Sequence, residues 1–204
     1  MGPLLYFIKS YFPLETFNEL NLPIDLDLNN EISKKELSRW SLLPPEYLSE
    51  KDHFQLSLHY FKISLYEDDG KIVSENIMKA LSHNQSIEAD RSDITQLLLG
   101  HLYLKLATKA HKSKQRKLIQ LAKSCYQDIN DENLKAIKSM HLSLCFWMLE
   151  EHSQCISSLQ RDCKGKDFPM TGNLILSKMF SYQGLNNIAH FYHERYQKSL
   201  TMAS

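Results

Sequence analysis

Apolar side chains recur at every third or fourth position along most of this chain, the spacing of one buried helix face. Phe54, Leu58, Phe61 and Leu65 follow it closely, and Asp68-Asp69-Gly70 then predicts a turn. The same period predicts further helices around Ile72–Leu81, Leu97–Leu106, Leu118–Ile129, Leu134–Leu149, Ser153–Cys163, Asn173–Tyr182 and Asn186–Leu200. Short polar loops separate these segments and no convincing strand ladder accompanies them. We therefore expect an all-α protein of antiparallel helical hairpins.

Residues 1–50 follow a different pattern. Leu4–Phe12 could form a short apolar helix, whereas Pro23–Asn29 alternates apolar and polar residues and predicts an extended segment. Ser33–Glu36 has the form of a capping box that begins a short helix, and Ser49–Asp52 has a second, weaker one. We divide the chain into an irregular N-terminal extension, residues 1–50, and a helical-repeat domain, residues 51–204.

The second half of the chain is similar to itself when the sequence is shifted by 34 residues. The aligned residues agree in size and polarity; they are Met140 with Leu174, Leu142 with Leu176, Ser143 with Ser177, Cys145 with Met179, Phe146 with Phe180, and Cys155 with Ala189. A fixed period of this length is typical of repeat proteins, in which each helical pair buries its apolar face against the next.

These positions resemble the tetratricopeptide repeat, a unit of about 34 residues that carries L-G-x-x-Y on its first helix and A-x-x-x-F on its second. Leu99, Gly100 and Tyr103 match the first motif, and Ala122 with Tyr126 matches the second. Later copies place small or aromatic residues at the same points: Ser143, Phe146, Cys155, Ser177, Phe180 and Ala189. An earlier, degenerate copy would hold Ser57, Tyr60, Val73 and Ile77.

The resemblance implies a right-handed array of stacked hairpins, in which small residues let paired helices approach and aromatic rings fill the space beside them. It is imperfect, because His193 stands where the closing aromatic belongs and Tyr103 is ten residues too far from Ala122. An irregular helical bundle with accidental spacing is the alternative.

Charge is balanced overall but not along the chain. Lys plus Arg and Asp plus Glu both number 24, which argues against a generally basic nucleic-acid-binding protein. Residues 1–104 nevertheless carry 9 basic and 16 acidic side chains, and residues 105–204 carry 15 and 8. No apolar run is long enough for a membrane span. The four cysteines lack metal-site spacing, so we expect reduced thiols and a cytoplasmic protein.

The most basic segment coincides with the ten extra residues. Its cations are Lys109, Lys112, Lys114, Arg116 and Lys117, with no acid among them. This segment could bind phosphates or an acidic protein surface. It could equally be a solvated turn between two helices, and it contains no aromatic residue for base stacking.

Catalytic and metal-binding patterns are absent from the sequence. The pairs His190/His193 and His141/Cys145 each provide two candidate ligands on one helix face, but neither has an evident third ligand. None of the common nucleophile, phosphate-loop or zinc-protease motifs occurs. We predict no enzyme, no cofactor and no metal site.

Binding is therefore the expected function. The protein would be an adaptor, assembly factor or secretion-type chaperone that holds a peptide or helix of another protein along Leu97–Leu106, Leu134–Leu149 and Asn173–Tyr182. Tyr103, Trp147, Tyr182 and the basic segment are the candidate contacts. Alternatives are a structural subunit docked through its N-terminal segment, and RNA or polyanion binding through residues 109–117. An oligomer or hetero-complex is expected, because neither end of the array is obviously polar.

Overall fold

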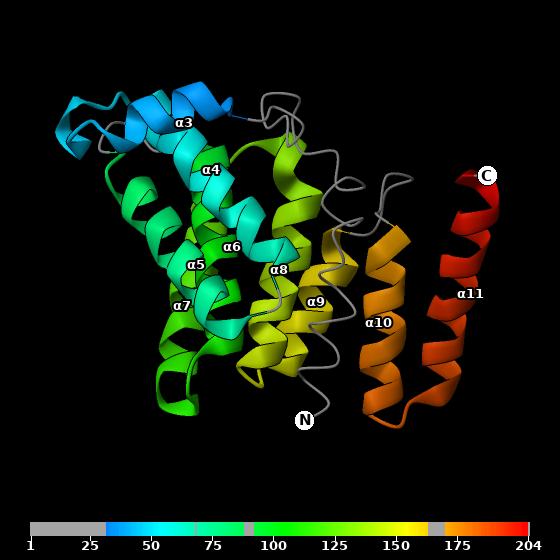
Figure 1. Ribbon diagram of the computed structural model, residues 1–204. Helices are drawn as coiled ribbons and strands as arrows, with labels where there is room; N and C mark the ends of the chain where they lie inside the picture. Colours follow the sequence, from blue (N-terminus) through cyan, green and yellow to red (C-terminus); the bar gives the residue numbers. More distant parts are fainter. Residues whose placement is uncertain (1–31, 68, 88–91, 163–169, 204) are drawn as a thin grey trace. The chain divides into compact units, whose positions relative to one another are not determined.

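The computed structural model describes residues 32–67, 69–87, 92–162 and 170–203, and every regular element in these ranges is helical (Figure 1). This confirms the all-α prediction; the segments predicted at residues 4–12 and 23–29 lie outside the described ranges. The elements are α3 (Lys34–Ser41), η1 (Pro45–Tyr47), α4 (Glu50–Tyr66), α5 (Gly70–Gln85), α6 (Asp93–Lys109), α7 (Lys112–Gln127), η2 (Glu132–Leu134), α8 (Lys135–Met148), α9 (His152–Asp162), α10 (Met170–Tyr182) and α11 (Asn186–Ala203). None of these helices has the length and apolar character that crossing a bilayer requires.

Side-chain caps determine where the first helices begin. Ser33 Oγ accepts a hydrogen bond from the Glu36 amide at 3.2 Å, and Ser49 Oγ accepts one from the Asp52 amide at 3.2 Å. The Glu36 and Asp52 carboxylates in turn each accept a hydrogen bond from the backbone amide of the capping serine. Both predicted capping boxes are therefore confirmed. Each cap stabilises its helix by about 1 kcal/mol because it satisfies an amide that the helix leaves unpaired.

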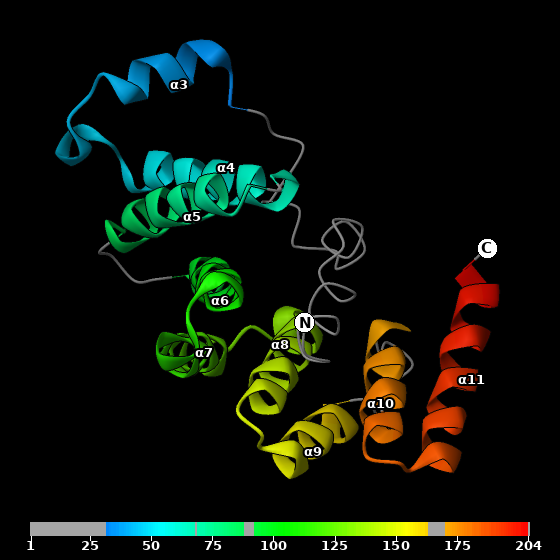
Figure 2. The same ribbon diagram turned by 60° about the horizontal axis from the view of Figure 1, so that its bottom comes forward.

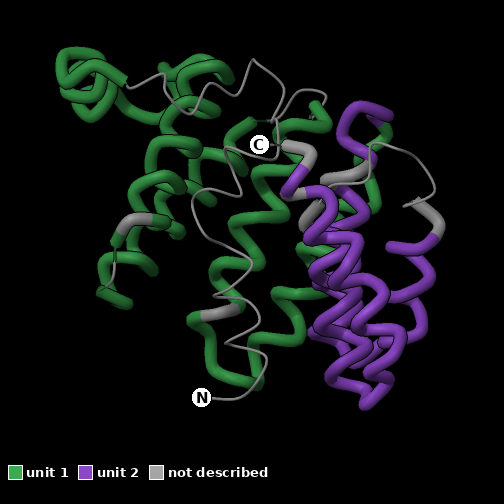
Figure 3. The backbone as a smooth tube through the Cα atoms, turned by 90° about the vertical axis from the view of Figure 1, so that its right-hand side faces the viewer, with its two compact units in different colours: residues 1–130 green, residues 131–204 purple. Residues whose placement is uncertain are grey.

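Contacts divide the chain into two compact units, Met1–Asn130 and Asp131–Ser204 (Figure 3). The division falls inside the segment that the sequence suggests as one repeat domain. Each unit contains two helical hairpins and is described by itself.

Unit 1 repeats with a longer period than the second half of the chain does. A shift of 43 carries α4 onto α6, with Ser49 and Ser92 as equivalent capping residues. A shift of 42 carries α5 onto α7 and places Ala80 on Ala122, both fully buried. By this shift Ala80, and not Val73, is the position of α5 that is equivalent to Ala122. In Figure 2, α4 lies beside α5 and α6 beside α7.

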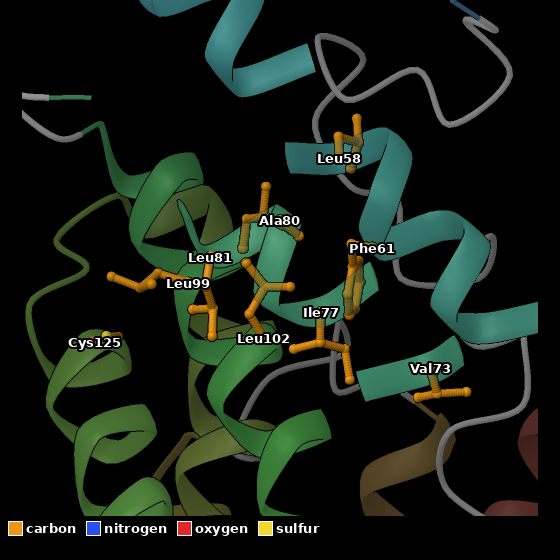
Figure 4. Close-up of a cluster of buried hydrophobic side chains, with 10 residues drawn as sticks. Leu58, Phe61, Val73, Ile77, Ala80, Leu81, Leu99, Leu102 and Cys125 are labelled. Carbon is orange, nitrogen blue, oxygen red and sulfur yellow. The ribbon is translucent and has the colours of Figure 1, made fainter. Parts of the chain in front are cut away.

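The core of unit 1 joins its two hairpins. It consists of Leu58 and Phe61 from α4, Val73, Ile77, Ala80 and Leu81 from α5, Leu98, Leu99 and Leu102 from α6, and Cys125 from α7 (Figure 4). Within the first hairpin, Ser57 Oγ donates a buried hydrogen bond to the Ala80 carbonyl at 2.9 Å. Small residues thus allow α4 and α5 to approach closely.

The two hairpins of unit 2 repeat at the same interval as the sequence does, and this repetition includes their turns. The α8–α9 turn has Glu150 at φ 66°, and the α10–α11 turn has Gly184 at φ 75°. In each turn the next amide bonds back to an aromatic residue's carbonyl, Glu151 to Phe146 at 2.8 Å and Leu185 to Phe180 at 2.9 Å. This pattern is the Schellman motif, and the shift that aligns Phe146 with Phe180 also aligns its two occurrences.

Candidate functional site

The residues assigned to repeat packing are all buried in their own units. They are Leu99, Gly100, Ala122 and Tyr126 in unit 1, and Ser143, Phe146, Cys155, Ser177, Phe180 and Ala189 in unit 2. A Cβ atom at position 100 would lie 2.6 Å from Tyr126 Cε1, so α6 and α7 approach at this glycine. The Tyr126 hydroxyl is held by His101 Nδ1 at 2.7 Å.

Equivalent positions in unit 2 form a second packed layer. Cys155 Sγ lies 3.2 Å from Met179 Sδ, and Phe180 stacks on Tyr192 with ring centroids 5.5 Å apart. Burial raises the pKa of the Cys155 thiol to about 12, since the thiolate would lose its hydration. The thiol is a packing group, as the repeat register suggests.

The basic segment lies at the tip of the α6–α7 hairpin. Lys109 ends α6, and Lys112, Lys114, Arg116 and Lys117 occupy the first turns of α7. Only Ala110 and His111 separate the helices, so the ten extra residues add helical turns instead of a loop. The helices α4 and α5 have the same lengths as α6 and α7, 17 and 16 residues, so the extra turns are a property of both hairpins in unit 1 and not an insertion into one of them.

The tip of the α6–α7 hairpin differs from the tip of the α4–α5 hairpin in charge and not in length. We call Lys109, Lys112, Lys114, Arg116 and Lys117 the basic tip. Its five cations are exposed, and no described acid forms an ion pair with any of them. Two of them, Lys112 and Lys114, lie in the first turn of α7, where the helix dipole is already positive and cations are unfavourable. Helix stability therefore does not explain the cations at the start of α7. The equivalent tip of the first hairpin carries the acidic residues Glu67 and Asp69.

The aromatic candidates differ in accessibility. Tyr103 is half-buried against the core of unit 1. Trp147 is only 5% exposed, because His152 and Tyr182 lie over it at centroid distances of 4.5 and 5.3 Å. Tyr182 is 63% exposed. A partner in this region of unit 2 would meet Tyr182 before Trp147.

The histidine pairs do not assemble a metal site in the described part of the chain. His190 Nε2 lies 3.3 Å from Glu194 Oε1, while His141 and Cys145 are both buried in α8. No group of three or more His, Cys, Asp or Glu side chains among the described residues could hold a metal ion.

One histidine pair is not evident from the sequence. His53 Nδ1 and His83 Nδ1 are 3.1 Å apart, and His53 Nε2 is 3.2 Å from the Pro45 carbonyl. If Nε2 donates to that carbonyl, neutral His53 accepts at Nδ1 and His83 donates. Burial lowers the pKa of His83, and the nearby His53 lowers it further. The two rings come from different helices, α4 and α5, so only folding brings them together.

Comparison of the chain with protein-family models, with curated proteins and with solved structures found no match. The functional argument therefore uses the geometry of the chain's own residues. Two surface features of the described residues enter it: the first helices of the hairpins and the basic tip.

Proposed function

We propose that the protein is an interaction module, a right-handed tetratricopeptide-like array that binds a peptide or helix of another protein. The observation that supports this most is the regular repetition of its hairpins. In unit 2 both turns, and the starts of the helices that follow them, recur at the same interval along the chain. Arrays of this kind present extended surfaces along the first helices of successive hairpins, suited to elongated ligands.

The accessible aromatic residues on the first helices are the proposed anchors. Tyr103 belongs to α6 and Tyr182 to α10, and each combines an apolar ring with a hydroxyl. Tyrosine is enriched among the residues that dominate binding energy, because it buries a large area at a small cost in side-chain entropy. We therefore expect each tyrosine to contribute to partner binding by its own unit, Tyr103 in unit 1 and Tyr182 in unit 2.

The test is a quantitative pull-down with the full chain, followed by titration with the purified partner. Tyr103→Ala and Tyr182→Ala should each weaken binding about tenfold, the effect of an average anchor. Tyr47→Ala is the matched control, since Tyr47 is 73% exposed but lies in η1, outside the hairpins. Unchanged affinity in both array variants would rule out binding along the first helices.

Binding of a polyanion such as RNA is the second candidate function. It is favoured by the basic tip, where five exposed cations gather without a described acidic partner and two of them, Lys112 and Lys114, lie in the first turn of α7 against the helix dipole. Phosphate binding releases counterions, so the affinity should fall steeply as salt increases. Fluorescence anisotropy with a generic RNA oligonucleotide measures this.

A pair of charge-matched variants separates the tip from net charge. Replacing Lys109, Lys112, Lys114 and Lys117 by Gln should abolish RNA binding. Replacing Lys34, Lys35, Lys51 and Lys71 by Gln removes the same charge and should preserve both RNA binding and its salt dependence. Absence of binding by the wild type at low salt would eliminate this candidate.

A further inference from the structure

Residues 33–48, which contain α3 and η1, precede the first hairpin, and we call them the α3–η1 arm. Neither α3 nor η1 has a buried residue, and in Figure 2 α3 stands apart from the packed pair of α4 and α5. The arm's hydrogen bonds to other described residues join positions no more than four apart, with one exception. The exception is the Pro45 carbonyl, which lies 3.2 Å from Nε2 of His53. Among the described residues, this bond is the arm's polar contact with the hairpin.

His53 uses both of its ring nitrogens. A carbonyl only accepts, so Nε2 donates to Pro45 and Nδ1 of the neutral ring accepts. The donor to that nitrogen is Nδ1 of His83, 3.1 Å away. His53 is only 4% exposed, whereas His83 is half-buried and stacks on Tyr60 with ring centroids 5.9 Å apart. The two neutral rings thus join the arm, α4 and α5 in one chain of hydrogen bonds.

Protons act on this chain of hydrogen bonds in two steps. The first goes to Nε2 of His83, which the pair does not use, and leaves Nδ1 of His83 donating to His53. The second has to go to Nδ1 of His53, where two N–H groups would then point at each other across 3.1 Å. Two cationic rings would also lie with their centroids 5.3 Å apart. Burial lowers the pKa of His83, and the nearby His53 lowers it further, so separated rings bind protons more readily than paired ones do.

The charged groups around the pair do not offset the added protons. Titratable groups on the neighbouring turns are Glu46 of η1, Glu50, Asp52, His59 and Tyr60 of α4, Lys79 of α5 and Asp93 of α6. None of these described carboxylates forms an ion pair with either ring. Asp52 is engaged with Ser49, and Asp93 accepts a hydrogen bond from the Asn130 amide at 3.1 Å. The Lys79 ammonium, 5.4 Å from the centre of the Tyr60 ring, adds a further positive charge.

We propose that His53 and His83 form an acid-sensitive latch, which holds the α3–η1 arm on the first hairpin at neutral pH and releases it when both rings are protonated. The core of unit 1 continues to hold α4 on α5 through residues such as Phe61 and Ile77, so the release is confined to the arm and its attachment. Each proton taken up on release raises the ratio of released to latched arm by up to about tenfold per pH unit. This device is separate from the binding surfaces proposed above.

Tryptophan fluorescence follows the arm, because Trp40 lies half-buried in α3 and the chain's other tryptophan, Trp147, lies in unit 2. In the full chain with Trp147→Phe, Trp40 emission should shift to longer wavelength between about pH 7.5 and about pH 5.0, with most of the far-UV circular dichroism retained. His83→Gln should abolish the shift, since the amide offers His53 both a donor and an acceptor without titrating in this range. His53→Phe removes both bonds and should show the acid emission already at neutral pH. His111→Gln, at an exposed histidine of the other hairpin, is the control and should leave the shift unchanged.

Three results would overturn the latch. They are constant Trp40 emission while NMR shows both imidazoles protonated, a shift that persists in His83→Gln, and a shift that coincides with loss of helix throughout the chain. If His53→Phe does not fold, nitrogen-15 NMR of the imidazoles replaces it. At neutral pH, Nε2 of His53 should carry the proton and Nδ1 should not; the opposite tautomer would also overturn the latch. None of these measurements involves a partner or RNA, so the latch and the proposed functions fail separately.

Discussion

Adding one methyl group at Gly100 should destabilise unit 1, although alanine forms helices better than glycine does. The new Cβ would lie 2.6 Å from Cε1 and 2.7 Å from Cζ of Tyr126, whereas carbon atoms in contact are normally about 3.5–4.0 Å apart. The ring has little room to move. Tyr126 is fully buried, its hydroxyl is held by His101 at 2.7 Å, and His101 stacks on Phe61.

The magnitude follows from two opposing effects. Overpacking a core of this kind costs about 1–3 kcal/mol. Replacing glycine by alanine within a helix gains about 1 kcal/mol. Gly100→Ala should therefore lower the free energy of unfolding by up to about 2 kcal/mol, the balance of the two effects. Tyr126→Leu, which copies Leu159 at the corresponding position of α9, removes the clashing ring. The double variant should then be more stable, by about 2 kcal/mol, than the sum of the single effects predicts.

Urea denaturation followed by far-UV circular dichroism gives the free energies of unfolding, and amide exchange in α6 and α7 assigns the loss to unit 1. Gly70→Ala is the control, because a Cβ there would meet no atom within 4 Å. It should be neutral or slightly stabilising. Additive effects in the double variant, or a Gly100→Ala protein more stable than the wild type by the full gain expected of alanine in a helix, would refute close packing of Gly100 against Tyr126.

Three further predictions concern the turns, a histidine and a thiol. Gly184→Ala should lower the free energy of unfolding by about 1 kcal/mol, and with it the melting temperature, because φ is 75° there. Glu150→Gly, at φ 66°, should raise the free energy of unfolding and the melting temperature by a similar or smaller amount. Equal melting temperatures would contradict the role of the left-handed turn. The pKa of His83 is lowered, first by burial and then by His53, so the unfolded chain binds a proton near pH 6.5 more readily than the folded one does. Stability should fall as the pH drops below 6.5, and His83→Gln should flatten that dependence in urea titrations; an unchanged slope would exclude His83 as its source. Cys155, with a pKa of about 12, should resist iodoacetamide at mildly alkaline pH until unit 2 unfolds, as peptide mapping would show; rapid labelling of the native protein would contradict its burial.

Local interactions were readable from the sequence alone. Helical periodicity predicts the helices, and the capping boxes at Ser33 and Ser49 predict two of their first residues, because each depends on side chains within a few positions of one another. The small residues at Gly100 and Ala122 were also recognisable from the repeat. They are buried where two helices approach, as is the Tyr126 ring beside them.

Tertiary structure decided the features that depend on distant segments. Trp147 looks like a binding residue in the sequence, but Tyr182, from the following hairpin, lies against its ring and leaves it 5% exposed. His53 and His83 meet only because α4 and α5 pack together. Sequence spacing alone did not show whether the ten extra residues form a loop or helix, or that both hairpins of unit 1 share them. Spacing along the chain determines which face of a helix a residue occupies. Which neighbour covers that face is set by packing between segments far apart in the sequence.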